Sequence, residues 1–149
     1  MSTRSLIGVA EQNGTVKAIY CHFDGYVEYV GKVLNAHYNS EALARQLLAL
    51  GDLSSLDERI APAPGEKHSF ENPAEGVTVA YHRDRGEKFH PAQEYASVEE
   101  MVTVGASDVW AEYCYVWKDG AWHVSTAGSR FYGTRPVADV LAEIEKQEG

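Results

Sequence analysis

The chain has little of what marks several common protein classes. It contains only two cysteines, Cys21 and Cys114, which are too few for a disulfide framework and indicate a reducing compartment. No run of about eighteen apolar residues occurs, so no membrane span is expected. The first residues are followed by alternating strand-like residues and not by a long apolar block, so no secretory signal is expected either. Basic residues are scarce, with 13 Lys and Arg against 22 Asp and Glu and a net charge of −9. This balance argues against direct binding of nucleic acid through phosphate neutralisation.

What is present predicts one folded domain over residues 1–149. Hydrophobic residues make up 44% of the 149 residues, which is too many for a disordered chain. The charge is spread evenly, because residues 1–75 carry ten acids and six bases and residues 76–149 carry twelve and seven. We therefore expect an acidic surface rather than a charged tail.

A first β-hairpin is predicted between residues 6–10 and 16–21. Asn13-Gly14 tolerates the positive φ angles of a type I′ turn. A two-residue loop at this point pairs Val9 with Ala18. The side chains then expected on the opposite face are Leu6, Gly8, Ile19 and Cys21.

A second hairpin is predicted between residues 109–117 and 121–125. With Asp119-Gly120 as its loop, Trp117 faces Trp122 across the strands. Alternation puts Tyr113, Tyr115 and Trp117 on one face and Trp110, Glu112, Cys114 and Val116 on the other. Two interpretations stay open, since the aromatic side chains either fill a core or leave one face exposed for binding a protein.

Helices are predicted from apolar spacing and from capping residues. Asp24 is expected to cap a helix over residues 27–38, and Asn39 or Ser40 a helix over residues 41–50. The capping box Ser97–Glu100 predicts a short helix that ends at Gly105. Residues 134–136 are expected to cap a last helix, whose inner stripe is Val137, Val140, Leu141 and Ile144.

The segments between these elements complete the predicted order. Residues 53–56 are expected to form a turn, residues 76–81 a strand and residues 82–88 a charged loop. The order is then β-β-α-α-β-α-β-β-α. It predicts an α+β fold, with an antiparallel sheet made of two hairpins and a middle strand and with helices packed on it.

Histidines and carboxylates suggest one candidate metal or acid–base site. His22 and Asp24 lie two residues apart, and the loop after residue 81 adds His82, Asp84 and His90. Imidazole and carboxylate groups are the usual metal ligands and proton carriers. His22, Asp24, His82 and His90 would form such a site if the two segments met. Otherwise Asp24 caps a helix and the loop pairs its own charges.

Common catalytic signatures are missing. The sequence has no Gly-x-Ser-x-Gly, no phosphate loop, no dinucleotide-binding glycine set and no His-Glu-x-x-His. Cys114 is expected to be packed inside a strand, and Cys21, which precedes a helix start, is the better candidate for a reactive thiol. These observations disfavour the common hydrolase, nucleotide-binding and zinc-protease classes.

Several stretches resemble a family of small, functionally uncharacterised proteins from bacteriophages, prophages and plasmids. They are STRSLIG at 2–8, YCHFDGY at 20–26, Val30-Gly31 with His37-Tyr38, LGDLSSL at 50–56 and, more loosely, 76–81, 84–86 and the Tyr-rich hairpin. The resemblance implies a cytoplasmic accessory protein of a mobile element in a bacterial host. Small acidic proteins of this kind often inhibit host defence, as anti-restriction and anti-CRISPR proteins do.

The sequence therefore favours a non-enzymatic binding protein without a cofactor. Its acidic surface would engage a basic host protein or a nucleoprotein complex that handles nucleic acid, with no direct contact to nucleic acid or membrane. The acids expected to bind are Glu28, Glu41, Glu99, Glu100, Glu143 and Glu145. The alternatives are a small enzyme built on the histidines, and an immunity or interaction protein for one cognate partner. A homodimer formed through the second hairpin is also open.

Overall fold

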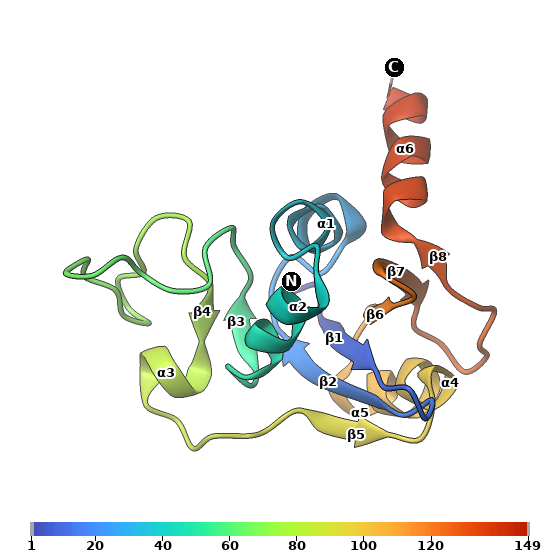
Figure 1. The fold of residues 1–149 in the computed structure, drawn as a ribbon, viewed down its shortest axis with the longest axis horizontal. Coiled ribbons are helices and arrows are strands. Elements are labelled where there is room, and N and C mark those ends of the chain that lie inside the picture. Colours follow the sequence, from blue (N-terminus) through green and yellow to red (C-terminus); the bar gives the residue numbers. More distant parts are fainter. Residues whose placement is uncertain (1, 149) are drawn as a thin grey trace.

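Strand β1 (Ser5–Ala10) lies at the centre of the sheet, between β2 (Val16–Cys21) and β6 (Tyr113–Lys118). The computed structural model describes residues 2–148 and confirms the α+β class (Figure 1). β1 pairs with β2 in antiparallel orientation but with β6 in parallel, so the sheet is mixed and not antiparallel as predicted. The other strands are β3 (Leu53–Ser55), β4 (Val79–Ala80), β5 (Gln93–Tyr95), β7 (Ala121–Thr126) and β8 (Arg135–Pro136).

The strand order is β4-β3-β2-β1-β6-β7-β8, with β5 also paired to β2. β3 joins β2 in parallel at Cys21, while β5 pairs with the start of the same strand, at residues 16–18. The chain leaves the first hairpin and returns along the other side of β1 as β6. Two parallel neighbours need such a long crossover connection, and the predicted element order alone did not reveal it.

Helices cover both faces of the sheet. On one face lie η1 (Val27–Gly31), α1 (Lys32–His37), α2 (Glu41–Leu48) and the start of α6 (Val137–Glu148), and on the other lie α4 (Val98–Glu100), η2 (Met101–Gly105) and α5 (Ala106–Val109). The remaining helix, α3 (Tyr81–Arg85), directly follows β4. Figure 1 shows α6 projecting from the body of the molecule. Within residues 2–148 no helix has the length and apolar character needed to cross a membrane.

Two apolar cores are separated by the sheet. The first includes Ile7, Val9, Ile19, Leu34, Leu47, Tyr115, Trp117 and Trp122. The second includes Leu6, Val16, Ala18, Met101, Val102, Cys114 and Val116. Both faces of the second hairpin are therefore core, which decides between the two interpretations left open by the sequence. Trp110 alone of the three tryptophans is exposed.

The predicted register of the first hairpin is wrong by one residue. Val9 pairs with Lys17, and Ala18 lies opposite Gly8. Asn13 does not adopt a positive φ angle; only Gly14 does, at 90°, and the Asn13 carboxamide oxygen accepts a hydrogen bond from the Thr15 amide at 3.1 Å. The loop is thus longer than the two-residue turn, and the slip moves every side chain of β2 to the other face.

The second hairpin forms with the predicted register. Trp117 lies opposite Trp122, with ring centroids 5.6 Å apart and the rings nearly perpendicular. Asp119 and Gly120 have φ angles of 51° and 75°, as a type I′ turn requires. The strand begins at Tyr113 and not at residue 109, because the preceding helical segment continues past Gly105 to residue 109.

Of the four predicted helix caps, two are confirmed and the one at Asp24 is wrong, while residues 135–136, expected to cap the last helix, form β8. The hydroxyl oxygens of Ser40 and Ser97 accept hydrogen bonds from the amides of the third residue that follows each of them. The Glu100 carboxylate accepts from the Ala96 amide at 2.7 Å, one residue before the Ser97 amide that a capping box would use. Asp24 caps nothing; it has a φ angle of 58°, and the first helical segment begins at Val27 without a side-chain cap.

Three connecting segments differ from the prediction. Residues 53–56, expected to form a turn, contribute β3; residues 82–88, expected to form a loop, contain most of α3; and the strand predicted over 76–81 is reduced to β4. Each segment is too short for its own pattern to decide, so tertiary packing selects its conformation. The last helix is confirmed: Val137 is fully buried, and the other members of its inner stripe pack against the first core.

Gly25 allows a close approach that the fold needs. A Cβ atom at this position would lie 2.8 Å from the Thr3 carbonyl oxygen and 2.9 Å from the Ser5 Cβ atom. The Gly25 amide donates to that same Thr3 oxygen, and the Gly25 carbonyl oxygen accepts from the Tyr115 hydroxyl at 2.7 Å. The junction after β2 is thereby attached to the first core.

We expect Gly25→Ala to lower the free energy of unfolding by about 1–3 kcal/mol, because the added methyl group must push backbone atoms apart. Urea denaturation measures this change. Gly128→Ala is the matched control, since a Cβ at Gly128 has no heavy-atom neighbour closer than 3.9 Å. Equal stability of the two variants would contradict the prediction.

Candidate functional site

The six acids predicted to bind a partner lie on four different elements. Glu28 is on η1, Glu41 on α2, and the other four are on α4 and α6. Three of them already have partners within the chain: Glu41 is 3.5 Å from Arg45, Glu100 accepts from the Ala96 amide, and Glu143 pairs with Arg135. Glu28, Glu99 and Glu145 are exposed. The six therefore do not form one patch.

One stretch of the sequence carries several acids and no base, although the exposed Lys17 lies opposite its first acid, Glu94. Residues 94–112, here called the acidic segment, contain five acids and no Lys, Arg or His. The acids are Glu94, Glu99, Glu100, Asp108 and Glu112, of which all but Glu100 are exposed. The same segment buries Met101 and Val102 against the sheet. Its inner side chains are thus committed to the second core, while its outer side chains are free for a partner.

Trp110 is the most conspicuous side chain of the acidic segment. It is 79% exposed, and its φ angle is 62°. That left-handed conformation ends α5, and glycine is the usual residue there because a side chain costs about 1–2 kcal/mol. Solvating a large indole is also unfavourable. A tryptophan that carries both costs is typical of a contact residue and not of a structural one.

An open hollow of about 960 Å³ lies beside Trp110. Its lining includes Val104, Asp108, Trp110, Glu112 and Ser129. Val104 is 54% exposed, so apolar surface and carboxylates occur side by side. The far wall is attached to the acidic segment by a hydrogen bond of 3.0 Å from the Ala127 amide to the Glu112 carbonyl oxygen. Sequence reasoning missed Trp110 because alternation assigned it to a strand face.

The histidines predicted as an alternative metal site are only partly brought together. His82 and His90 line a second hollow, of about 290 Å³, with Tyr20 and Asp52. Asp24 lies apart from them, with its carboxylate accepting a hydrogen bond from the Tyr26 hydroxyl at 3.4 Å. Within residues 2–148, no three His, Cys, Asp or Glu side chains are arranged to hold a metal ion.

His22 belongs to a short chain of hydrogen bonds. Its Nδ1 atom is 2.6 Å from the Tyr20 hydroxyl, and its Nε2 atom is 3.1 Å from the Ser2 hydroxyl. Burial, together with the charge of Arg4, lowers the pKa of His22. The neutral imidazole favoured by this environment can accept one hydrogen bond and donate the other. His22 is thus held in place by Ser2 and Tyr20.

Residues 20–26, 50–56 and 76–81 meet beside His22. The Phe23 amide donates to the Ser54 carbonyl oxygen, and the Tyr81 amide donates to the Asp52 carbonyl oxygen. The Asp52 carboxylate accepts from the Tyr20 amide at 3.0 Å. Asp52 and Tyr81 were absent from the sequence-based candidates because nothing in their local pattern shows that they meet Tyr20.

The charged stretch around residue 84 contains a buried ionic cluster. The Asp84 side chain is only 4% exposed and lies 2.8 Å from Arg83 and 3.2 Å from His68. It also accepts a hydrogen bond from the Ala80 amide at 2.7 Å. Burial raises the pKa of Asp84, but the hydrogen bonds from Arg83, Ala80 and His68 outweigh it, so the pKa is lowered. This cluster attaches the segment around His68 to α3.

Both cysteines are packed inside the two cores. Cys21 and Cys114 are buried, and burial raises the pKa of each thiol to about 12. A nucleophilic cysteine needs a lowered pKa, because the thiolate is the reactive form. Cys21, the better candidate in the sequence, therefore has no support as a nucleophile.

No protein-family model, curated protein or solved structure matches this chain. Its function must therefore be inferred from the placement of its own residues. Two places stand out, namely the surface of the acidic segment around Trp110 and the hollow beside Asp52.

Replacing Asp84 by Asn should reduce stability and alter its dependence on pH. Since the folded pKa lies below the ordinary value of about 3.9, Asp84 stabilises the fold above that pH and ceases to do so as the pH falls through the folded pKa. We expect Asp84→Asn to cost about 3 kcal/mol at pH 7, because it breaks a buried ion pair.

The measurement is urea denaturation from pH 7 down to about pH 2. The variant should show a shallower loss of stability below about pH 4 than the wild type. Asp119→Asn, in the exposed turn of the second hairpin, is the control and should leave the profile unchanged. A variant profile parallel to that of the wild type would refute the role assigned to Asp84.

Fluorescence quenching should report the negative potential at Trp110. This indole is 79% exposed, whereas Trp117 and Trp122 are 7% and 1% exposed, so collisional quenchers reach essentially Trp110 alone. Relative to free N-acetyl-tryptophanamide, we expect caesium quenching to be enhanced and iodide quenching to be reduced at low ionic strength, and both effects to shrink near 1 M salt, where the screening length is about 3 Å.

Asp108→Asn with Glu112→Gln should reduce the preference for caesium. Glu143→Gln with Glu145→Gln removes the same charge from α6 and should leave the preference nearly intact, because these acids lie on another element. Equal quenching by the two ions at low salt, after each is normalised to its quenching of N-acetyl-tryptophanamide, would show that the potential at Trp110 is not negative.

Proposed function

We propose that this chain is a non-enzymatic binding protein whose acidic segment docks on a basic protein surface. The observation that carries the proposal is the placement of Trp110, which is 79% exposed within a segment that holds five acids and no base. Tryptophan is among the residues that contribute most to binding at protein interfaces. Carboxylates around it would speed the encounter with a positively charged partner and select against neutral ones.

The same charge disfavours nucleic acid as the direct ligand. Phosphates would be repelled by the five carboxylates of the acidic segment, and no basic residue within that segment could release counterions from them. A protein that itself binds nucleic acid has the complementary basic surface. The partner we infer is therefore a basic protein, or the protein part of a nucleoprotein complex.

The resemblance to mobile-element proteins suggests which basic partner this is. We propose a nucleic-acid-handling defence complex in the cytoplasm of a bacterial host, inhibited in the manner of anti-CRISPR or anti-restriction proteins. The acidic segment would cover a surface that otherwise binds phosphates. An immunity or interaction protein for one cognate partner would use the same surface, and the two differ in whether the captured partner binds nucleic acid.

A photo-cross-linking group at Ser107 tests this proposal, since this residue is exposed and lines the hollow beside Trp110. In lysate of the bacterial host, we expect capture of a protein with an isoelectric point above about 9. Trp110→Ala should reduce capture about tenfold or more, and added salt should weaken it.

The variant Glu143→Gln with Glu145→Gln is the matched control, because it removes two acids on α6 and leaves the acidic segment intact. Docking through the acidic segment predicts unchanged capture by this variant, whereas lost capture would place the binding acids on α6. Capture only of neutral or acidic proteins, or capture that Trp110→Ala leaves unchanged, would rule out docking through the acidic segment.

A further inference from the structure

The hollow beside Asp52 is built by segments that are distant in the sequence. Tyr20 comes from β2, Asp52 from the residue before β3, Tyr81 and His82 from α3, and Glu87, Lys88 and His90 from the segment that follows. Its volume of about 290 Å³ suits a side-chain-sized group and is small for a nucleotide.

Backbone contacts hold this hollow open. The Tyr81 amide donates to the Asp52 carbonyl oxygen, and the Glu87 amide donates to the Tyr81 carbonyl oxygen, both at 3.2 Å. Gly51 has a φ angle of 76°, and a Cβ there would lie 2.7 Å from the His90 carbonyl oxygen. Only glycine therefore permits the segment around His90 to pack so close to Asp52.

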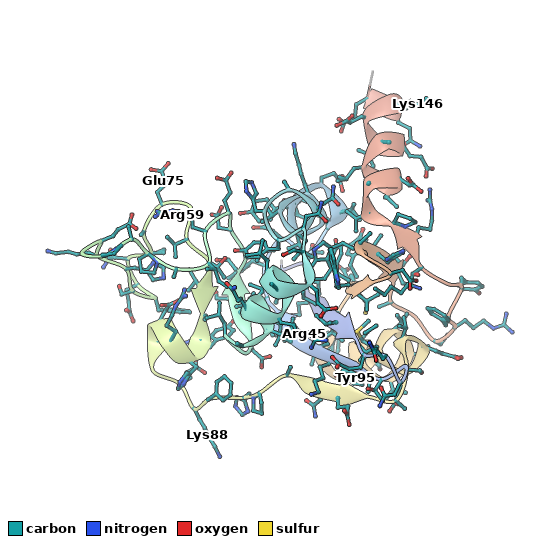
Figure 2. The ribbon with its side chains drawn as sticks, viewed as in Figure 1. Arg45, Arg59, Glu75, Lys88, Tyr95 and Lys146 are labelled. Atoms are coloured by element: carbon teal, nitrogen blue, oxygen red, sulfur yellow. The ribbon has the colours of Figure 1, made fainter. Side chains whose placement is uncertain are left out.

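The charged side chains that line the hollow are Asp52, Glu87 and Lys88, so two acids outnumber one base. One Asp52 carboxylate oxygen accepts from the Tyr20 amide, and the other makes no hydrogen bond to the protein within residues 2–148. Glu87 is exposed and 3.5 Å from Arg85, so it is partly neutralised. Lys88 also lines the hollow, and Figure 2 shows its side chain extending away from the body of the molecule.

We propose that this hollow binds an organic cation, namely an alkylammonium or guanidinium group. The free oxygen of Asp52 would accept a charge-assisted hydrogen bond from it, and the rings of Tyr20 and Tyr81 would contact its charge through their electron-rich faces. The two carboxylates disfavour an anion. The proposal does not depend on docking through the acidic segment, because it uses different residues.

The test is a titration followed by the amide signals of the isotope-labelled full chain. The probes are N-acetyl-lysine methylamide, N-acetyl-arginine methylamide and butylamine, with N-acetyl-norleucine methylamide as the neutral control. We expect the cations to shift the amide signals of Tyr20, Asp52, Tyr81 and His82, with dissociation constants of about 1 mM. No shift at about 10 mM, or an equal shift with the norleucine compound, would overturn the proposal.

Asp52→Asn provides the matched variant. Its carboxamide oxygen can still accept from the Tyr20 amide, so the hollow is retained while its charge is removed. Affinity for the cations should fall about tenfold or more, because a hydrogen bond to a charged group is lost. Asp119→Asn should have no effect. Unchanged affinity in Asp52→Asn, with a native spectrum, would overturn the proposal.

Glu87→Gln serves as a second variant, because Glu87 is exposed and its replacement does not threaten the fold. A smaller loss of affinity, of about twofold, is expected from it.

The capped and free probes distinguish two sources of the cation. Tighter binding of the capped lysine or arginine supports a side chain of a bound protein, whereas tighter binding of butylamine supports a free amine. A failure to capture a basic protein would leave these results unaffected.

Discussion

The burial of both faces of β1 is the constraint on which the rest of the structure depends. Ile7 and Val9 point into the first core and Leu6 into the second, so neither face of this central strand is left for water. Helices must therefore cover the sheet on both sides. The helices η1, α1 and α2, which pack on the first face, directly follow β2. The helices α4, η2 and α5, which pack on the second face, come just before β6. The long connection between the two hairpins follows from the need to cover both faces.

The helices on the second face, α4, η2 and α5, contribute to both the core and the surface. Its inner residues, Met101, Val102 and Ala106, fill the second core. Its outer residues are acids, together with Trp110, whose left-handed backbone ends the helix. Because the two sets of side chains point in opposite directions, the surface can be specialised for a partner at little cost to the packing beneath it. The acidic segment therefore combines a rigid support with an exposed aromatic anchor, as protein interfaces require.

Asp52, at the second candidate site, likewise contributes both to the fold and to the proposed binding. Its carboxylate and its carbonyl oxygen accept hydrogen bonds from the amides of Tyr20 and Tyr81, two residues that are sixty-one positions apart in the sequence. Satisfying these amides aligns the end of β2 with the start of α3. The remaining carboxylate oxygen makes no such hydrogen bond. Its negative charge is therefore available to the cation that we propose. Structure and binding thus share one side chain here as well.

The sequence by itself determined the features that depend on neighbouring residues. The type I′ turn at Asp119-Gly120, the caps at Ser40 and Ser97, the α+β class and the acidic balance all follow from local chemistry or from composition. The Asn13-Gly14 loop did not follow, because more than one hairpin turn suits that pair and the register depends on how β2 packs. Only the tertiary structure decided that β6 lies parallel to β1, that Trp110 is exposed while Trp117 is buried, and that Asp52 meets Tyr20. These are contacts between distant segments, and the balance of burial over the whole chain selects them.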